Sequence, residues 1–123
     1  MHNSPFDDAD VLDAVPGATY RALADERRRR VLYLLLENDR LPVAELADVL
    51  SAWEADGIAT PDDRDPVAVD LRHVHLPKLA AAGLIGYDDA ADRVERRDLR
   101  GPVRQLLLAA LRYESDVTAE ESP

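Results

Sequence analysis

The sequence contains no cysteine, which excludes disulfides, thiolate metal ligands and a cysteine nucleophile. It also has no apolar run near the roughly 20 residues that a transmembrane helix needs. Residues 1–10 show neither the basic n-region nor the apolar h-region of a secretory signal. From these absences we expect a cytoplasmic protein without a membrane span.

Lysine is nearly absent as well, since Lys78 is the only one. The 25 acidic residues include 17 aspartates, and the formal net charge is −10. The 46% of hydrophobic residues and the periodic segments exclude general disorder, and 123 residues suit one domain with a modest core. This Asp-rich, Lys-poor composition resembles that of proteins from salt-loving archaea, so we expect a halophilic protein.

The charge is unevenly distributed along the chain. Residues 67–112 carry eight basic and six acidic residues, a net of +2, which leaves −12 for the rest of the chain. An acidic chain is at first sight a poor nucleic-acid binder. The region from 67 to 112 is nevertheless the least acidic part, and it is where we look for a binding surface.

Three parts of the chain differ in composition. Residues 1–17 contain four Asp and two Pro and predict a flexible acidic arm. Residues 18–114 predict the folded domain, and residues 115–123 a disordered acidic tail. Within the domain, a short turn of helix is expected over residues 18–24.

The first long helix is predicted over residues 26–38, with Asp25 as its N-cap. Arg27 to Arg30 form four consecutive arginines, which fan around a helix and cannot make one patch. We therefore favour ion pairs with the abundant acids over a nucleic-acid site, although one of the four could touch a phosphate.

A second helix is predicted over residues 43–53, after a possible short strand at Leu41-Pro42. Its apolar residues recur at helical spacing, with Trp53 expected as a core plug: Val43, Leu46, Ala47, Leu50 and Trp53. Residues 54–66 hold Gly57, two prolines and five acids, and predict a loop too long for a minimal helix-turn-helix.

The chain is organised around residues 71–94, which hold most of a predicted third helix and a hairpin. The helix is expected over residues 67–82, with an inward face of Val67, Leu71, Val74, Leu79 and Ala82. Pro77 lies inside it and should bend the helix or delay its start. Gly83 suits the left-handed position after the helix. Strands at 84–87 and 93–96, joined by an acidic turn, complete the form of a recognition helix and its wing.

A last helix is predicted over residues 103–114, with Pro102 at a favourable first position. It carries an apolar stripe made of Val103, Leu106, Leu107, Ala110 and Leu111. The stripe could cover the chain's own first helix or form a homodimer interface, and we favour the dimer. The predicted fold class is mainly α: a winged helix-turn-helix with a helical core, a small β-hairpin wing and a C-terminal helix.

The segments ALADERRRRVLYLLLEN, VAELADVL and HLPKLAAAGLIGYD resemble ArsR-type winged-helix repressors and, more closely, a haloarchaeal winged-helix family of uncharacterised function. The resemblance covers residues 20–94. Its matching features here are Trp53, the insert 54–66, the segment 75–79, Ala82-Gly83 and Tyr87-Asp88. It implies a DNA-binding transcriptional regulator. Metal sensing is not implied, because cysteine and a histidine on the last helix are both missing.

The DNA-binding hypothesis names a partner and a set of residues. The partner is double-stranded DNA, bound by a homodimer through the third helix in the major groove. Arg72 and His73 would read bases, while phosphates would be contacted by Lys78, Arg93, Arg96 and Arg97. The alternative is a winged-helix protein-interaction module without DNA binding, and a DNA-mimic protein would rest on net charge alone.

Catalytic and metal chemistry find no support in the residues. There is no phosphate-binding glycine loop, no nucleophile elbow and no HExxH motif. His73 and His75 would stand roughly 200° apart around a helix and could not chelate one ion, so His75 is expected to bond within the domain. We expect neither an enzyme nor a cofactor or metal site.

Overall fold

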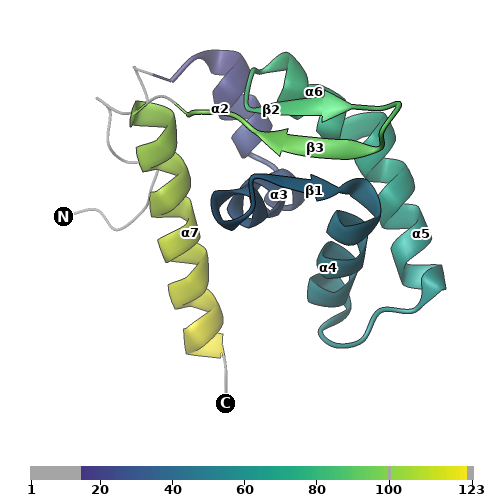
Figure 1. The fold of residues 1–123 in the computed structure, drawn as a ribbon. Coiled ribbons are helices and arrows are strands. Elements are labelled where there is room, and N and C mark those ends of the chain that lie inside the picture. The colour runs from purple at the N-terminus through teal and green to yellow at the C-terminus, as the bar shows by residue number, and fades with distance from the viewer. Residues whose placement is uncertain (1–14, 100, 122–123) are drawn as a thin grey trace.

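The computed structural model describes residues 15–99 and 101–121. Most of the arm predicted for residues 1–17 lies outside these ranges, but Val15 is buried and a helix already begins at Gly17. The chain forms a mainly helical fold with a small antiparallel sheet (Figure 1). The elements in order are α2 (Gly17–Leu23), α3 (Glu26–Glu37), β1 (Arg40–Pro42), α4 (Val43–Ala55), α5 (Pro61–Asp70), η1 (Leu71–His75), α6 (Leu76–Ala81), β2 (Ile85–Asp88), β3 (Arg93–Arg96) and α7 (Gly101–Glu121).

The sheet has the order β1-β3-β2, so the predicted strand at Leu41-Pro42 does join the hairpin. Val94 of β3 stands opposite Leu41 of β1 and Tyr87 of β2. Val94 is fully buried, and its face of the sheet covers the helices. Because side chains alternate across a strand, the neighbours of Val94 along β3 face away from the core.

Helices α3 and α4 form where their apolar spacing predicts them. The Asp25 side chain accepts a hydrogen bond from the Arg28 N–H, as an N-cap should. Val43, Leu46, Ala47 and Leu50 of α4 are fully buried. Trp53 is a correction: it is 46% exposed rather than a core plug. It lies one turn beyond the buried stripe, with Arg30 over its ring at 5.5 Å from the centroid.

The loop predicted for residues 54–66 is also corrected. Helix α4 continues to Ala55, α5 begins at Pro61, and only residues 56–60 connect them. Thr60 and Asp63 form a capping box, and Pro61 occupies the first turn, where its missing N–H costs nothing. Three of the five acids, Asp62, Asp63 and Asp65, and both prolines therefore belong to α5 rather than to a loop.

The third helical segment runs from 61 to 81 and contains the π-helical turn η1. The Leu76 N–H bonds to Leu71 O, five residues back, so Pro77 falls in the first turn of α6. The extra residue of this turn shifts the inward face. Val74, predicted to point inward, is 37% exposed, while His75 and Leu76 are buried. Gly83 adopts φ +76° after α6, as predicted.

Helix α7 starts at Gly101 and continues past the predicted end at Glu114 to Glu121. The segment predicted as a disordered tail from residue 115 is thus helical as far as 121. Figure 1 shows α7 standing beside α3 at the opposite end of the fold from α4 and α5. Val103, Leu106, Leu107 and Ala110 are buried in the single chain, and Leu111 is half-buried. The stripe therefore packs on the chain's own core. This was the alternative to the favoured dimer interface, so the prediction that these residues form that interface is corrected.

Candidate functional site

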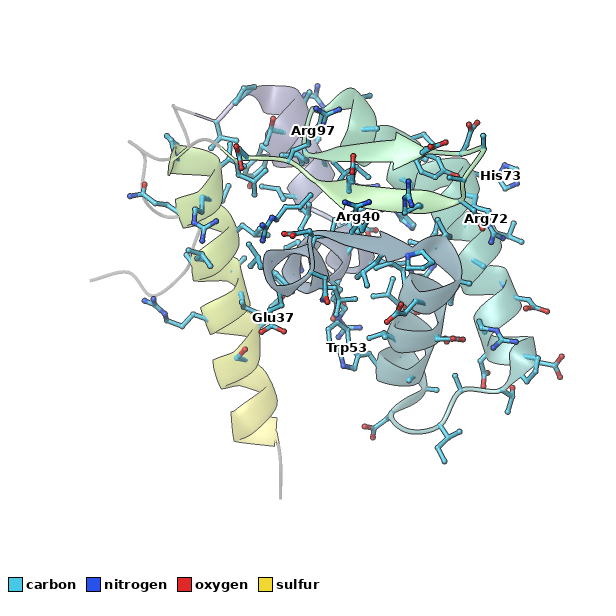
Figure 2. The ribbon with its side chains drawn as sticks, in the orientation of Figure 1. Glu37, Arg40, Trp53, Arg72, His73 and Arg97 are labelled. Carbon is cyan, nitrogen blue, oxygen red and sulfur yellow. The ribbon has the colours of Figure 1, made fainter. Side chains whose placement is uncertain are left out.

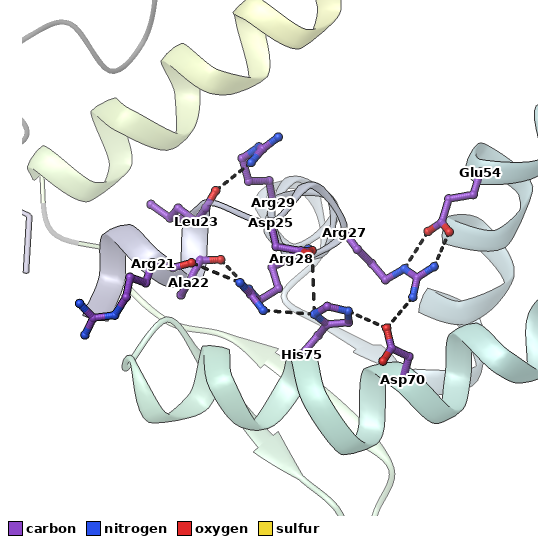
Figure 3. Close-up of polar contacts among 10 residues, drawn as sticks. All are labelled: Arg21, Ala22, Leu23, Asp25, Arg27, Arg28, Arg29, Glu54, Asp70 and His75. Atoms are coloured by element: carbon purple, nitrogen blue, oxygen red, sulfur yellow. Dashed lines mark hydrogen bonds and ion pairs between the residues drawn. The ribbon is translucent and has the colours of Figure 1, made fainter. Parts of the chain in front are cut away.

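A chain of polar side chains anchors the third helical segment to α3 and α4 (Figure 3). Arg27 donates to Glu54 at 2.8 Å through Nε and to Asp70 at 2.7 Å through Nη1. Asp70 also lies 2.8 Å from Nε2 of His75, which is 6% exposed. The hydrogen bond to Glu54 raises the pKa of Arg27. His75 thus bonds within the domain, as the sequence predicted.

The four consecutive arginines are all engaged inside the fold. Arg28 donates to the Ala22 and Arg21 carbonyls, Arg29 to Glu114, and Arg30 pairs with Glu26. Together with Arg27, they are only partly exposed. The prediction that this run pairs with acids is confirmed for Arg27, Arg29 and Arg30, whereas Arg28 bonds to backbone carbonyls instead.

Arg72 links the third helical segment to the tip of the hairpin. Its guanidinium donates to both carboxylate oxygens of Asp92, at 3.0 and 2.7 Å. This bond raises the pKa of Arg72 and lowers the pKa of Asp92. The Asp92 carbonyl also accepts from the Val43 N–H at 2.9 Å. Arg72, the predicted base reader, therefore holds the hairpin against η1 and the start of α4.

The other predicted DNA contacts divide into two groups. Arg96 bonds to Asp39 and to the Leu36 carbonyl, so its charge is matched. Four side chains are exposed and make no hydrogen bond or ion pair within the described residues: His73, Lys78, Arg93 and Arg97. His73 lies beside Arg72 at the hairpin end of the sheet, while Arg97 lies toward its other end (Figure 2).

Arg40 is a further unpaired cation that the sequence analysis did not single out. It lies on β1 directly opposite Glu95 of β3, and Glu95 in turn stands opposite Gly86 of β2. Arg93 and Arg97 flank Glu95 at two-residue spacing, which puts them on the same side of the strand. Asp88 of β2 stands opposite Arg93 on the same side. We call this side the outer sheet face and define it by Arg40, Gly86, Asp88, Arg93, Glu95 and Arg97.

Gly86 leaves a hollow on the outer sheet face. Its volume is about 200 Å³, and its lining includes Arg93, Glu95 and Arg97. Nε and Nη2 of Arg97 lie 3.5 Å from the position that a Cβ at residue 86 would occupy. Arg97 therefore lies across the glycine, with its guanidinium at an open surface.

The third helical segment changes charge along its exposed side. Its first turns expose Asp62, Asp63 and Asp65, whereas His73 and Lys78 are exposed farther along. A hydrogen bond from the Thr60 N–H lowers the pKa of Asp63. The N-terminal end of this segment therefore repels phosphate, and only its second half can approach an anion.

The described residues show neither a metal-binding cluster nor a membrane-spanning helix. Within 15–99 and 101–121, no group of three or more His, Asp or Glu side chains is placed to hold a metal ion. No helix over the same ranges has the length and apolar composition needed to cross a membrane. An open hollow of about 750 Å³ lies beside α5, with Pro66, Val69 and His73 in its lining.

The fold and the outer sheet face define a mainly helical protein with a small antiparallel sheet that carries unpaired arginines. The chain belongs to the family described as "Domain of unknown function (DUF7344)", which matches residues 20–95. That match spans the fold from α2 through β3. No curated protein and no solved structure matches the chain at a significant level.

Proposed function

We propose that this protein is a DNA-binding transcriptional regulator of the winged-helix type, acting in the cytoplasm as a homodimer. The order helix, strand, helix, long helical segment and hairpin, with β1 on the outer edge of the hairpin, supports the winged-helix class. The third helical segment would lie next to DNA, with the hairpin flanking it.

One observation carries this proposal. Among the described residues, six arginines pair with acids, including Arg72 and Arg96, whereas Lys78 of α6 and Arg93 and Arg97 of the hairpin region do not. His73, Lys78, Arg93 and Arg97 were predicted as DNA contacts, and all four remain exposed without an acidic partner in the described residues. Unpaired cations near a helix and a hairpin suit phosphate contact, since phosphate contacts set the position of a protein on a duplex.

The test is DNA binding by the whole chain over a range of KCl concentrations. Genomic fragments are selected on the protein, and binding of an enriched duplex is compared with that of a scrambled one. His73→Ala should reduce the preference for the enriched duplex, whereas Lys78→Ala should weaken both duplexes alike. Failure of the wild-type protein to retain any duplex at any KCl concentration would refute the proposal.

A second candidate is a protein-interaction module without DNA binding. Recognition helices read bases with their N-terminal residues, but here those turns expose Asp62, Asp63 and Asp65. The hollow beside Pro66 and Val69 offers apolar surface next to these acids. Two results together would favour this candidate: the wild-type protein retains no DNA, and it forms a stable protein complex that Val69→Asp abolishes.

The homodimer needs an interface other than the predicted stripe, because that stripe is buried in the single chain. On the exposed side of α7, Leu108 stands between Arg104 and Arg112 at one-turn spacing. Light scattering of the wild type and of Leu108→Glu, at low and high KCl, measures the oligomeric state and tests this side of α7.

A further inference from the structure

We propose that the outer sheet face binds the sugar-phosphate backbone of a nucleic acid, with Arg40 and Arg97 as contacts beside Arg93. This inference rests on the proposed DNA-binding function and moves its main electrostatic contact from the third helical segment to the sheet. It adds Arg40, on β1, to the binding surface and removes Arg72 and Arg96 from it.

The arrangement of the three arginines is the first argument. They surround one residue, Glu95: Arg40 lies across the strand from it, and Arg93 and Arg97 lie two residues before and after it. None of them forms an ion pair with Glu95 within the described residues, although cross-strand neighbours are only about 5 Å apart at Cβ. Their guanidinium groups are therefore available to an external acceptor.

The chemistry of the face favours phosphate as that acceptor. Guanidinium groups present a planar set of donors that fits phosphate oxygens in a bidentate manner. The hollow at Gly86 gives an oxygen access to the Arg97 guanidinium, because residue 86 has no side chain of its own and Arg97 lies across it. Contact at this face would depend on shape and charge, and so would be independent of base sequence.

A protein partner fits this face less well. Stable protein interfaces have an apolar centre, often with aromatic anchors. The residues that define the outer sheet face are three arginines, two acids and one glycine, a net charge of +1, and Tyr87 beside them is only half exposed. The face therefore offers charged groups and no apolar anchor.

The acidic start of the third helical segment supports the same assignment. Asp62, Asp63 and Asp65 oppose a close approach of phosphates at that end. The outer sheet face and the exposed His73 and Lys78 lie on the parts of the fold that lack this acidic stretch. A duplex that contacts the sheet would keep its phosphates away from the three aspartates.

Two variants of the full chain test the inference with a labelled mixed-sequence duplex, followed by fluorescence anisotropy. The first, Arg40→Gln/Arg93→Gln/Arg97→Gln, removes the three charges of the face. Its matched control, Arg21→Gln/Arg30→Gln/Arg64→Gln, removes three charges from α2, α3 and α5. The face variant should lose about tenfold or more in affinity, and its slope of log affinity against log salt should fall by roughly 2.7. The control should lose clearly less on both measures.

A third variant guards against simple unfolding. Glu95→Gln removes the carboxylate at the centre of the face, so it should strengthen binding of every duplex by a similar factor. A damaged fold would not produce a gain in affinity. Circular dichroism of each variant checks that the fold is kept.

The possible results separate the inference from the function on which it rests. If wild-type protein binds the duplex but the face variant behaves like its matched control, the inference is overturned and the proposed function stands. An unchanged or weaker affinity for Glu95→Gln would also count against the inference. If wild-type protein binds no duplex at any salt concentration, the proposed function fails and the inference fails with it.

Discussion

Trp53 shows how one side chain can follow the helical spacing of a core and still lie outside it. It is 46% exposed and carries Arg30 over its ring, whereas Leu50, one turn earlier, is fully buried. Cation–π contacts at exposed sites are worth only about 0.5–1 kcal/mol. Trp53 should therefore contribute less than Leu50 to the free energy of unfolding, although both belong to the same apolar series of α4.

We expect Trp53→Ala to lower the free energy of unfolding by about 1 kcal/mol or less. Leu50→Ala should lower it by about 2–5 kcal/mol, because it leaves a cavity in the core. Urea unfolding followed by circular dichroism measures both. Equal losses for the two variants would place the indole ring in the core and contradict the structure.

Asp25 combines a capping role with a charge that responds to pH. Burial acts to raise its pKa, but the hydrogen bond from the Arg28 N–H, the electrostatic influence of His75 and Arg28, and the Arg27 N–H together outweigh burial, so the pKa is lowered. A carboxylate whose pKa is lowered by folding stabilises the fold above its unfolded value of 3.8. That stabilisation is lost as the pH falls through the lower, folded value.

Asp25→Asn keeps an acceptor for the Arg28 N–H but removes the charge. We expect the variant to be less stable than wild type at neutral pH, with the difference shrinking as the pH falls below 3.8. Urea unfolding of both proteins over this pH series measures the difference. A constant difference at all pH values would show that the charge of Asp25 has no part in stability.

The roles of some residues could be predicted from their sequence neighbours, and the roles of others could not. Asp25 as an N-cap and Gly83 with positive φ follow from chemistry within a few residues, and both are confirmed. The Arg72–Asp92 pair joins residues 20 apart, and no local pattern reveals it. Arg40 was passed over because its significance depends on the pairing of β1 with β3.

At the scale of elements, the start of α5 had a signal that could have been used. Thr60 and Asp63 have the spacing of a capping box, and Pro61 is a favourable first residue, but the prolines and acids were interpreted as a loop. The π-helical turn is a different case. It depends on how η1 and Pro77 pack together, and hydrophobic spacing alone placed Val74 inward when it is half exposed.

The end of α6 allows a matched pair of glycine substitutions. Gly83 has φ +76° and Gly57 does not have a positive φ, and neither would place a Cβ within 4 Å of another atom. Gly83→Ala should cost roughly 1–2 kcal/mol, because a left-handed backbone is unfavourable for alanine. Gly57→Ala should be neutral or stabilise by up to about 1 kcal/mol. Thermal unfolding of the two variants provides the comparison, and a neutral Gly83→Ala would contradict the helix-end geometry.

Glu114 attaches α7 to α3. Its carboxylate accepts from Arg29 Nε at 2.8 Å and from the Tyr33 hydroxyl at 2.6 Å. Burial, with a further contribution from Glu114, raises the pKa of Tyr33. Both donors come from the buried side of α3, so loss of the carboxylate would leave polar groups at a packed surface without this acceptor.

We expect Glu114→Ala to cost about 1–3 kcal/mol, the usual penalty for leaving buried donors without an acceptor. Tyr33→Phe removes only one donor and should cost about 0.5–1.5 kcal/mol. Hydrogen exchange should quicken in the second half of α7 in both variants and stay slow in α4. Unchanged exchange in α7 would mean that apolar packing alone holds this helix.

For the whole molecule, pairing of charges explains why the candidate site was only partly predictable. Composition indicated that residues 67–112 are the least acidic part, but it could not tell which cations the fold would neutralise. Arg72 and Arg96 looked available in sequence and are bound to Asp92 and Asp39. The candidate site consists of the basic side chains that are still unpaired after these ion pairs form. Which side chains pair depends on the tertiary structure.

The net charge of −10 also sets the response of stability to salt. Self-repulsion of like charges destabilises a compact state, whereas exposed ion pairs contribute only about 0–1 kcal/mol each. Screening should therefore relieve more repulsion than it removes attraction. We expect the melting temperature to rise with KCl, most steeply below about 1 M, where the screening length has fallen to roughly 3 Å.

A variant of the same chain isolates this effect from the general action of salt. Glu37, Asp89 and Asp98 are exposed and form no ion pair within the described residues, and Glu37 ends α3, where a negative charge is unfavourable. Glu37→Gln/Asp89→Asn/Asp98→Asn should therefore melt at a higher temperature than wild type at low KCl and gain less from added KCl. If instead the melting temperature of wild type falls as KCl rises, the ion pairs outweigh the repulsion, and the expectation of a salt-adapted protein is wrong.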